Sequence, residues 1–128
     1  MKKAFCTGVL LALALLVPTT ASAHTLSLSG AAGKAKAAAQ DVANTNVTND
    51  PAFTQVSQVF ASRRYCNRLP LRRGSSRLSP HAVRCSVLWS YRAQDGRQAD
   101  CLAAVNVKYR SRTSRRTRSR VTDVDCFR

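Results

Sequence analysis

Residues 81–92 read HAVRCSVLWSYR, and their alternation decides the fold. Every second position is apolar or aromatic, namely Val83, Cys85, Val87, Trp89 and Tyr91. The positions between them hold Arg84, Ser86, Leu88, Ser90 and Arg92. Successive side chains of a β-strand point to opposite faces of a sheet, so this pattern predicts a strand with one buried face and one solvent-facing face. The two aromatic side chains fall on the buried face, which favours core packing over stacking on a ligand.

The chain after residue 92 continues in the same way. Asp95-Gly96 is a strong signal for a tight turn. Residues 101–110 alternate again, and their apolar face holds Cys101, Ala103, Val105, Val107 and Tyr109. We expect a polar, arginine-rich turn at 111–117 and a last strand over 121–127, with Thr122, Val124 and Cys126 facing inward. Strands that follow one another through short turns predict an antiparallel meander.

The segment before residue 70 has two interpretations. Asp50-Pro51 is a good start for a helix, and Phe53, Val56 and Phe60 would then share one face of it. The same residues could instead enter a strand. We favour a strand over 56–69, because β-branched and aromatic residues continue as far as Tyr65.

An alanine-rich segment lies further towards the N-terminus, where residues 31–42 read AAGKAKAAAQDV. Alanine has the highest helix propensity, and the Ser29 hydroxyl could accept a hydrogen bond from the first turn. Ala35, Ala38, Ala39 and Val42 share one helical face. We therefore predict a helix over 31–43 and a polar loop over 44–51. The fold class is α+β, with one N-terminal helix packed on a four-stranded antiparallel meander sheet.

Four cysteines follow residue 60, namely Cys66, Cys85, Cys101 and Cys126. Four cysteines allow three pairings, and the sequence alone does not choose among them. Symmetry about the two expected hairpin loops favours Cys66–Cys85 and Cys101–Cys126. Each bridge would close a loop of about 20 residues and stabilise the fold by about 3 kcal/mol. The spacing contains no C-x-x-C pair, which disfavours a zinc site.

The first 23 residues have the pattern of a secretory signal peptide. Lys2 and Lys3 precede an apolar run over 4–17, and Ala21-Ser22-Ala23 matches the small-residue cleavage site. That run is shorter than the roughly 20 residues needed to span a bilayer. We expect cleavage after Ala23, loss of Cys6 and a secreted domain over 24–128 without a transmembrane segment. An exported chain enters an oxidising compartment, in which cysteines pair.

The net charge of +15 is unevenly distributed. Residues 24–60 form a neutral, alanine-rich helical arm, whereas residues 61–128 hold 17 basic and 4 acidic residues. The densest cluster lies in the hairpin turn and the strand after it, and consists of Arg110, Arg112, Arg115, Arg116, Arg118 and Arg120. A second cluster in the first hairpin loop consists of Arg72, Arg73 and Arg77, preceded by Arg63, Arg64 and Arg68.

Two explanations of these arginines stand side by side. The guanidinium is a planar fork of donors suited to phosphate, sulfate and carboxylate, so the six residues from Arg110 to Arg120 are candidate anion-binding residues. The partner would be a cell-wall polymer, a polysaccharide or extracellular nucleic acid. Alternatively the arginines are solvated surface produced by high-GC codon bias, since residues 24–128 hold 16 Arg and 3 Lys, and no Glu.

Catalytic motifs are missing from the sequence. The only histidines are His24 and His81, and there is no Glu, G-x-S-x-G elbow, P-loop or G-x-G-x-x-G. Asp123 and Asp125 are expected on the outward face of the last strand, paired with neighbouring arginines. We therefore predict a protein that is not an enzyme, with no catalytic residues, no metal and no cofactor.

The cysteine-bearing half resembles a group of small secreted proteins. The pattern consists of Cys66-Asn67-Arg68-Leu69, residues 81–87, Cys101 and Val105-Asn106-Val107. It is similar to that of uncharacterised proteins of high-GC Gram-positive bacteria with a signal peptide, an alanine-rich helix and a disulfide-bearing antiparallel sheet. The resemblance spans residues 31–126 and implies fold and export, but carries over no site residue. The helix-on-sheet order is also similar to that of inhibitor modules, so the alternative function is a secreted inhibitor or protein-partner-binding module that uses the sheet face.

Overall fold

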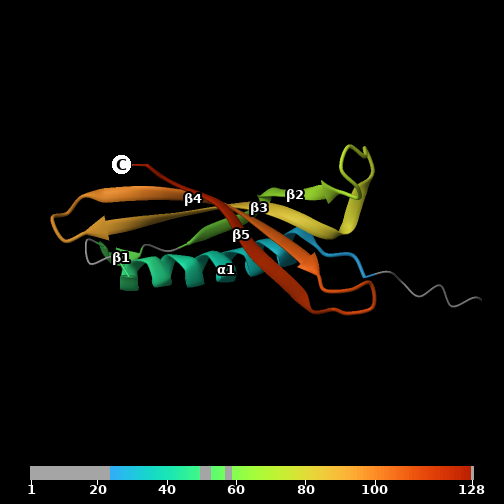
Figure 1. Ribbon diagram of the computed structural model, residues 1–128, viewed down its shortest axis with the longest axis horizontal. Helices are drawn as coiled ribbons and strands as arrows, with labels where there is room; N and C mark the ends of the chain where they lie inside the picture. The colour runs from blue at the N-terminus through green and yellow to red at the C-terminus, as the bar shows by residue number, and fades with distance from the viewer. Residues whose placement is uncertain (1–23, 50–52, 57–58, 128) are drawn as a thin grey trace, which may run out of the picture.

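The computed structural model describes residues 24–49, 53–56 and 59–127 of the chain (Figure 1). Its elements are α1 (Leu28–Asn49), β1 (Phe53–Val56), β2 (Phe60–Pro70), β3 (Leu78–Ala93), β4 (Gln98–Tyr109) and β5 (Thr117–Phe127). The predicted signal peptide, residues 1–23, lies outside the described residues. The helix lies along one face of the sheet and contacts all five strands. The predicted α+β class is confirmed.

The sheet is an antiparallel meander centred on β3. One edge of β3 pairs with β4, which pairs in turn with β5. The other edge of β3 pairs with β1 near residues 91–93 and with β2 from residue 88 to residue 78. Because β1 and β2 occupy successive parts of the same edge, the sheet has four strand positions, as predicted.

The first strand position differs in detail from the prediction. The strand expected over 56–69 is divided into β1 and β2, and the helical alternative for residues 53–60 is wrong at β1 and at Phe60. Residues 57 and 58, between the two strands, lie outside the described residues. β3 has 16 residues and is longer than either partner, which leaves room on its edge for both.

The helix is longer than predicted. It begins at Leu28, and its N-cap is Ser27 instead of Ser29, because the Gly30 N–H donates to Ser27 Oγ at 3.0 Å. It continues through the expected loop to Asn49. Asn46 Nδ2 donates to the hydroxyl of Tyr91 at 3.3 Å, so a tertiary contact holds the last turns that local sequence assigned to a loop.

Small side chains bring the helix close to the sheet. Ala31, Ala35, Ala39 and Ala43 recur every four residues and are fully buried. They pack on the inward faces of β3 and β4, which hold the largest buried side chains, among them Trp89 and Val105. The predicted inward faces of these two strands are confirmed, whereas Val42, expected on the helix's core face, is only half-buried.

The inward face predicted for the last strand is partly wrong. The register shifts between Ala103 and Ala104, where Asp123 adopts a positive φ of 51° and forms a β-bulge. Thr122 therefore pairs with Ala104 on the outward face, and its hydroxyl donates to the Ala104 carbonyl at 3.2 Å. Beyond the bulge, Val124 and Cys126 again point to the inward face. They are exposed, because α1 does not cover the end of this edge strand.

Both predicted disulfides are confirmed. Cys66 bonds to Cys85 and Cys101 bonds to Cys126, with Cα–Cα distances of 4.0 and 4.1 Å. Each pair occupies directly opposite positions on neighbouring antiparallel strands. The two bridges therefore fasten β2 and β5 to the two central strands.

Candidate anion-binding end and open sheet face

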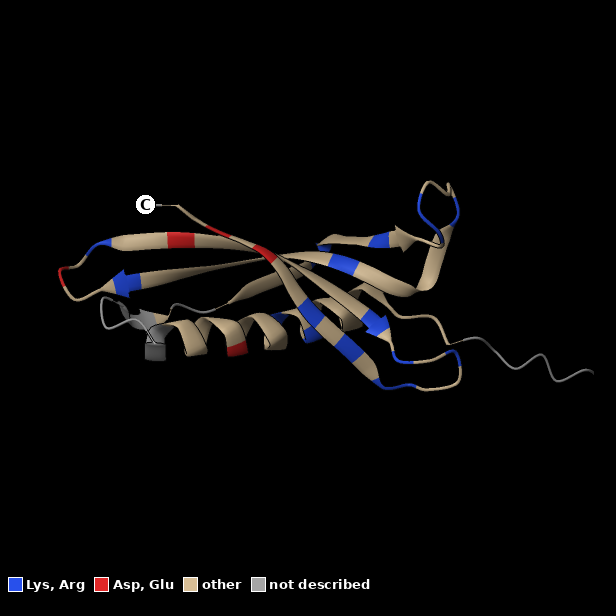
Figure 2. Ribbon diagram, viewed as in Figure 1, with Lys and Arg blue, Asp and Glu red and all other residues tan. Residues whose placement is uncertain are grey.

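The meander brings the two arginine-rich loops to one end of the molecule. Alternate connections of a meander lie at the same end, so the β2–β3 loop, residues 71–77, lies at the same end of the sheet as the β4–β5 turn, residues 110–116. Figure 2 shows blue segments in both loops, with the start of the described chain beside the β4–β5 turn. We call these two loops, together with Lys108, Arg118 and Arg120, the basic end.

The six predicted anion-binding arginines all lie at this end. The first four lie in the turn and the last two lie in β5, and all six are exposed. The backbone N–H of Arg110 donates to the Arg116 carbonyl at 2.9 Å and closes the turn. Arg118 pairs with Lys108 and Arg120 pairs with Asn106, so both arginines stand on the sheet face opposite the helix.

The charges of the basic end are not neutralised internally. In the described part of the chain, ion pairs form between Arg84 and Asp123 at 2.9 Å and between Arg97 and Asp95. Neither pair includes an arginine of the two loops, and residues 71–77 and 108–120 contain no Asp or Glu. The guanidinium groups at this end are therefore available to an external anion.

The N-terminal residue of the described chain also contacts the basic end. Arg115 Nε donates to His24 Nε2 at 3.4 Å, and the Leu26 N–H donates to the Pro80 carbonyl at 2.9 Å. Signal cleavage after Ala23 would therefore leave a new α-amino group beside the β4–β5 turn and raise the positive charge there.

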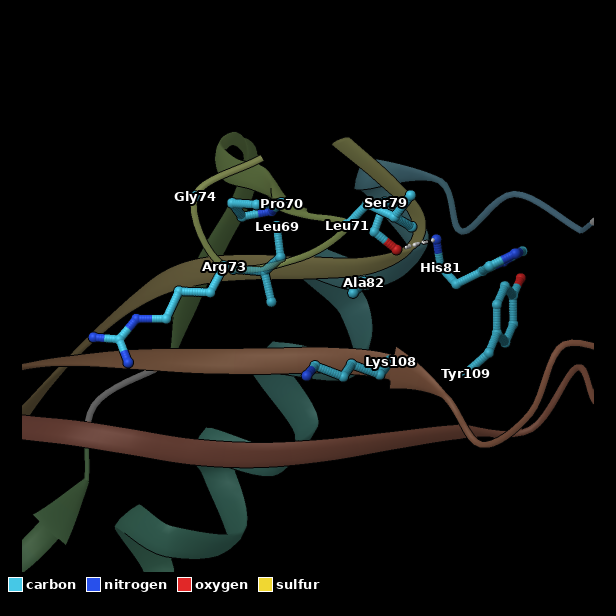
Figure 3. A pocket seen from close by; sticks show the side chains of 10 residues that line it. All are labelled: Leu69, Pro70, Leu71, Arg73, Gly74, Ser79, His81, Ala82, Lys108 and Tyr109. Atoms are coloured by element: carbon cyan, nitrogen blue, oxygen red, sulfur yellow. Dashed lines mark hydrogen bonds between the residues drawn. The ribbon is translucent and has the colours of Figure 1, made fainter. Parts of the chain in front are cut away.

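A hollow of about 540 Å³ lies between the β2–β3 loop and the end of β4 (Figure 3). The loop folds over the outward face of the sheet and buries Ala82. Leu69 and Leu71 form an apolar wall of the hollow, while Arg73 and Lys108 supply positive charge. His81 and Tyr109 also line the hollow, with ring centroids 5.9 Å apart in an edge arrangement.

The outward face of the sheet is open across its middle, and no element of the described chain forms a second layer over it. Phe60, Leu88 and Leu102 lie side by side in one row across β2, β3 and β4. Their exposed fractions are 55%, 46% and 43%, and Tyr65 packs edge-on against Phe60 with ring centroids 6.2 Å apart. We call these four residues the apolar row.

Two carboxylates lie level with the apolar row or beyond it, on the side away from the basic end. Asp125 pairs with Leu102, and Asp100 lies one row further from the basic end. The Ser90 hydroxyl and the Gln98 amide both donate to Asp100 and lower the pKa of its carboxyl. The expected pairing of Asp123 with an arginine is confirmed by its bond to Arg84.

Sequence reasoning missed part of this arrangement. The hollow depends on how the β2–β3 loop folds back, which no local pattern encodes. Lys108 could have been found, because the alternation of residues 101–110 places it on the outward face beside Arg118. The placement of the two loops at the same end also follows from the order of a meander.

Comparison with known proteins supplies no assignment, since no protein-family model, no curated protein and no solved structure matches the chain. The helix in the described part of the chain is not apolar enough to cross a membrane.

Proposed function

We propose that this chain is an exported, non-catalytic protein that binds an anionic polymer through its basic end. The observation that carries the proposal is the placement of two exposed, arginine-rich loops at one end of the sheet, whose charges have no carboxylate partner in the described residues. Arginine pairs with phosphate, sulfate and carboxylate groups alike. The polymer is therefore a cell-wall polymer, an acidic polysaccharide or extracellular nucleic acid.

Two features support export. The first 23 residues have a positively charged start, an apolar run and a cleavage pattern typical of a signal peptide. The disulfides Cys66–Cys85 and Cys101–Cys126 are typical of proteins that fold in oxidising compartments. A secreted protein meets the anionic polymers of the cell surface directly.

The hollow gives the basic end a place for one anionic group of such a polymer. Arg73 and Lys108 would pair with its charge, while Leu69 and Leu71 would contact the carbon skeleton next to it. The arginines of the β4–β5 turn would then contact the neighbouring repeats.

The test is the salt dependence of binding to heparin and to double-stranded DNA. Each phosphate that the protein neutralises contributes about −0.9 to the slope of log K against log salt. Replacing Arg115 and Arg116 with Ser is expected to make the slope on DNA shallower by about 2. The matched control replaces Arg63 and Arg64, another adjacent exposed pair, with Ser and removes the same charge from the middle of β2.

The control variant is expected to keep the wild-type slope. If both variants reduce the slope equally, the arginines act as diffuse charge and the proposed site is wrong. Binding that does not respond to salt would also exclude the proposal.

A second candidate function is the inhibitor or partner-binding role of the sheet face. It is favoured by the exposed apolar row, which a monomer without partners has no need to present. Contacts of this kind persist at high salt, whereas polymer binding through the basic end is lost, so the salt series separates the two functions.

A further inference from the structure

We propose that the open face of the sheet is the interface of a homodimer, in which a second copy of this chain packs face to face with its strands reversed. The proposal is independent of polymer binding, because it uses the middle of the sheet instead of the two loops. In this dimer, a second copy of the chain covers the apolar row.

The apolar row provides the centre of the interface. Phe60, Leu88 and Leu102 form one continuous strip across three neighbouring strands, and Tyr65 extends it beside Phe60. The neighbouring row towards the basic end holds the small side chains of Ser86, Ala104 and Thr122. Large side chains of one copy would therefore pack over small side chains of the other, as facing sheets require.

Charges on either side of the apolar row make the face complementary to itself. On β4, Asp100 lies one row to one side of Leu102, and Asn106 lies two rows to the other side. Asn106 is flanked by Arg84 on β3 and Arg120 on β5. A two-fold axis that crosses the strands between Leu102 and Ala104 exchanges the row of Asp100 with the row of Asn106.

This rotation places Asp100 of each copy opposite Asn106 of the other copy, next to Arg120 and to Arg84, of which Arg84 already pairs with Asp123 of its own chain. A two-fold interface requires such self-complementarity, and each contact occurs twice. An arrangement with parallel strands, with its two-fold axis along β4, would instead oppose Asp100 to Asp100 and Arg84 to Arg120. The outermost rows lie outside the apposed area, because the β2–β3 loop folds over Ala82, the partner of Lys108 on β4.

The reversed orientation also reduces repulsion between two basic chains. It places the two basic ends at opposite ends of the dimer, several Debye lengths of about 8 Å apart at physiological salt. The dimer would present two separate polymer-binding ends.

The available area predicts a weak dimer. From Asp100 to Asn106, the rows that the two-fold axis exchanges, the face is about 20 Å long, and four strand positions make it about 19 Å wide. Two such faces bury roughly 800 Å², which is in the range of weak, transient interfaces. We therefore expect a dissociation constant of about 10–100 µM.

The test is sedimentation of the oxidised chain over residues 24–128, from about 5 to about 500 µM at physiological salt. The wild type is expected to form a dimer. Leu102→Arg should remain monomeric throughout, and because Leu102 is 43% exposed, circular dichroism and disulfide mapping should show an unchanged fold. Arg112→Asp, in the β4–β5 turn, is the control and should dimerise like the wild type.

Charge-reversal variants provide the decisive part of the test. Asp100→Arg alone opposes arginine to arginine, and Arg120→Asp alone opposes aspartate to aspartate, so each variant should associate at least 10-fold more weakly. In a mixture of the two variants, arginines of one chain meet aspartates of the other at both contacts only if positions 100 and 120 face each other. The mixture should therefore restore the dimer as a heterodimer.

A wild type that is monomeric at the highest concentration would overturn the proposal. So would a dimer that survives Leu102→Arg, or a mixture of the two charge variants that does not associate. Heparin binding by the Leu102→Arg chain tests polymer binding separately, because that substitution leaves the basic end intact.

Discussion

Cys101 is fully buried on β4, whereas its disulfide partner Cys126, directly opposite on β5, is exposed. The end of β5 beyond the bulge at Asp123 thus adds little to the core. Its attachment depends on the disulfide and on the ladder with β4.

Removal of this disulfide is expected to loosen the end of β5 first. Cys101→Ala with Cys126→Ala should reduce the free energy of unfolding by about 3 kcal/mol, as expected for a closed loop of this length. Hydrogen exchange should accelerate at residues 124–127 more than at the centre of β4. The matched control, Cys66→Ala with Cys85→Ala, should leave exchange at residues 124–127 protected. Equal exchange in the two variants would contradict this assignment.

The N-cap gives a second prediction with a closely matched control. Ser27→Ala removes the acceptor of the Gly30 N–H and should destabilise the protein by about 1 kcal/mol. Ser29→Ala changes a serine two residues away, which lies inside the first turn, and should leave stability unchanged or slightly raised. Urea denaturation of the two variants measures the difference. A larger loss for Ser29→Ala would show that the helix begins where the sequence alone indicates.

The bulge at Asp123 gives a third prediction. Its φ of 51° lies in the left-handed region, which glycine adopts freely and which a β-carbon disfavours. Asp123→Gly and Asp123→Ala both remove the ion pair with Arg84, so their difference isolates the backbone. The alanine variant should be less stable than the glycine variant by about 1 kcal/mol. Equal urea midpoints would mean that the bulge is not retained in solution.

The central strands could be predicted because each of their residues faces either the core or the solvent. Alternation fixes β3 and β4, and opposite positions on neighbouring strands then fix the Cys66–Cys85 pairing. The errors occur where a tertiary contact overrides local sequence. The Leu26 bond to Pro80 and the cap at Ser27 start the helix early, and the Asn46 bond to Tyr91 extends its end.

The candidate site divides in the same way. Its arginines and their common end follow from composition and from the order of strands. The hollow does not, because it depends on how residues 71–77 fold over Ala82. The apolar row was also not evident, since a leucine at position 88 or 102 on an outward face becomes informative only when register places the two side by side.

The carboxyl of Asp100 provides a pH-dependent test of the open face. The Ser90 hydroxyl donates to this carboxylate, as does the Gln98 amide, and both bonds lower its pKa below the ordinary value of 3.8. A carboxyl whose pKa is lower in the folded state than in the unfolded state stabilises the fold above the unfolded value. That stabilisation is lost as the pH falls through the folded pKa.

Ser90→Ala is therefore expected to raise the pKa of Asp100 towards 3.8. The part of the acid-dependent loss of stability that the Asp100 carboxyl causes should then become smaller. Gln98→Ala should raise the pKa less, because the bond from Ser90 has the larger effect. Carbon-detected NMR titration of the Asp100 carboxyl in dilute protein measures both variants directly. An Asp100 that titrates at its ordinary value in the wild type, or that is unaffected by Ser90→Ala, would show that the Ser90 bond does not form in solution.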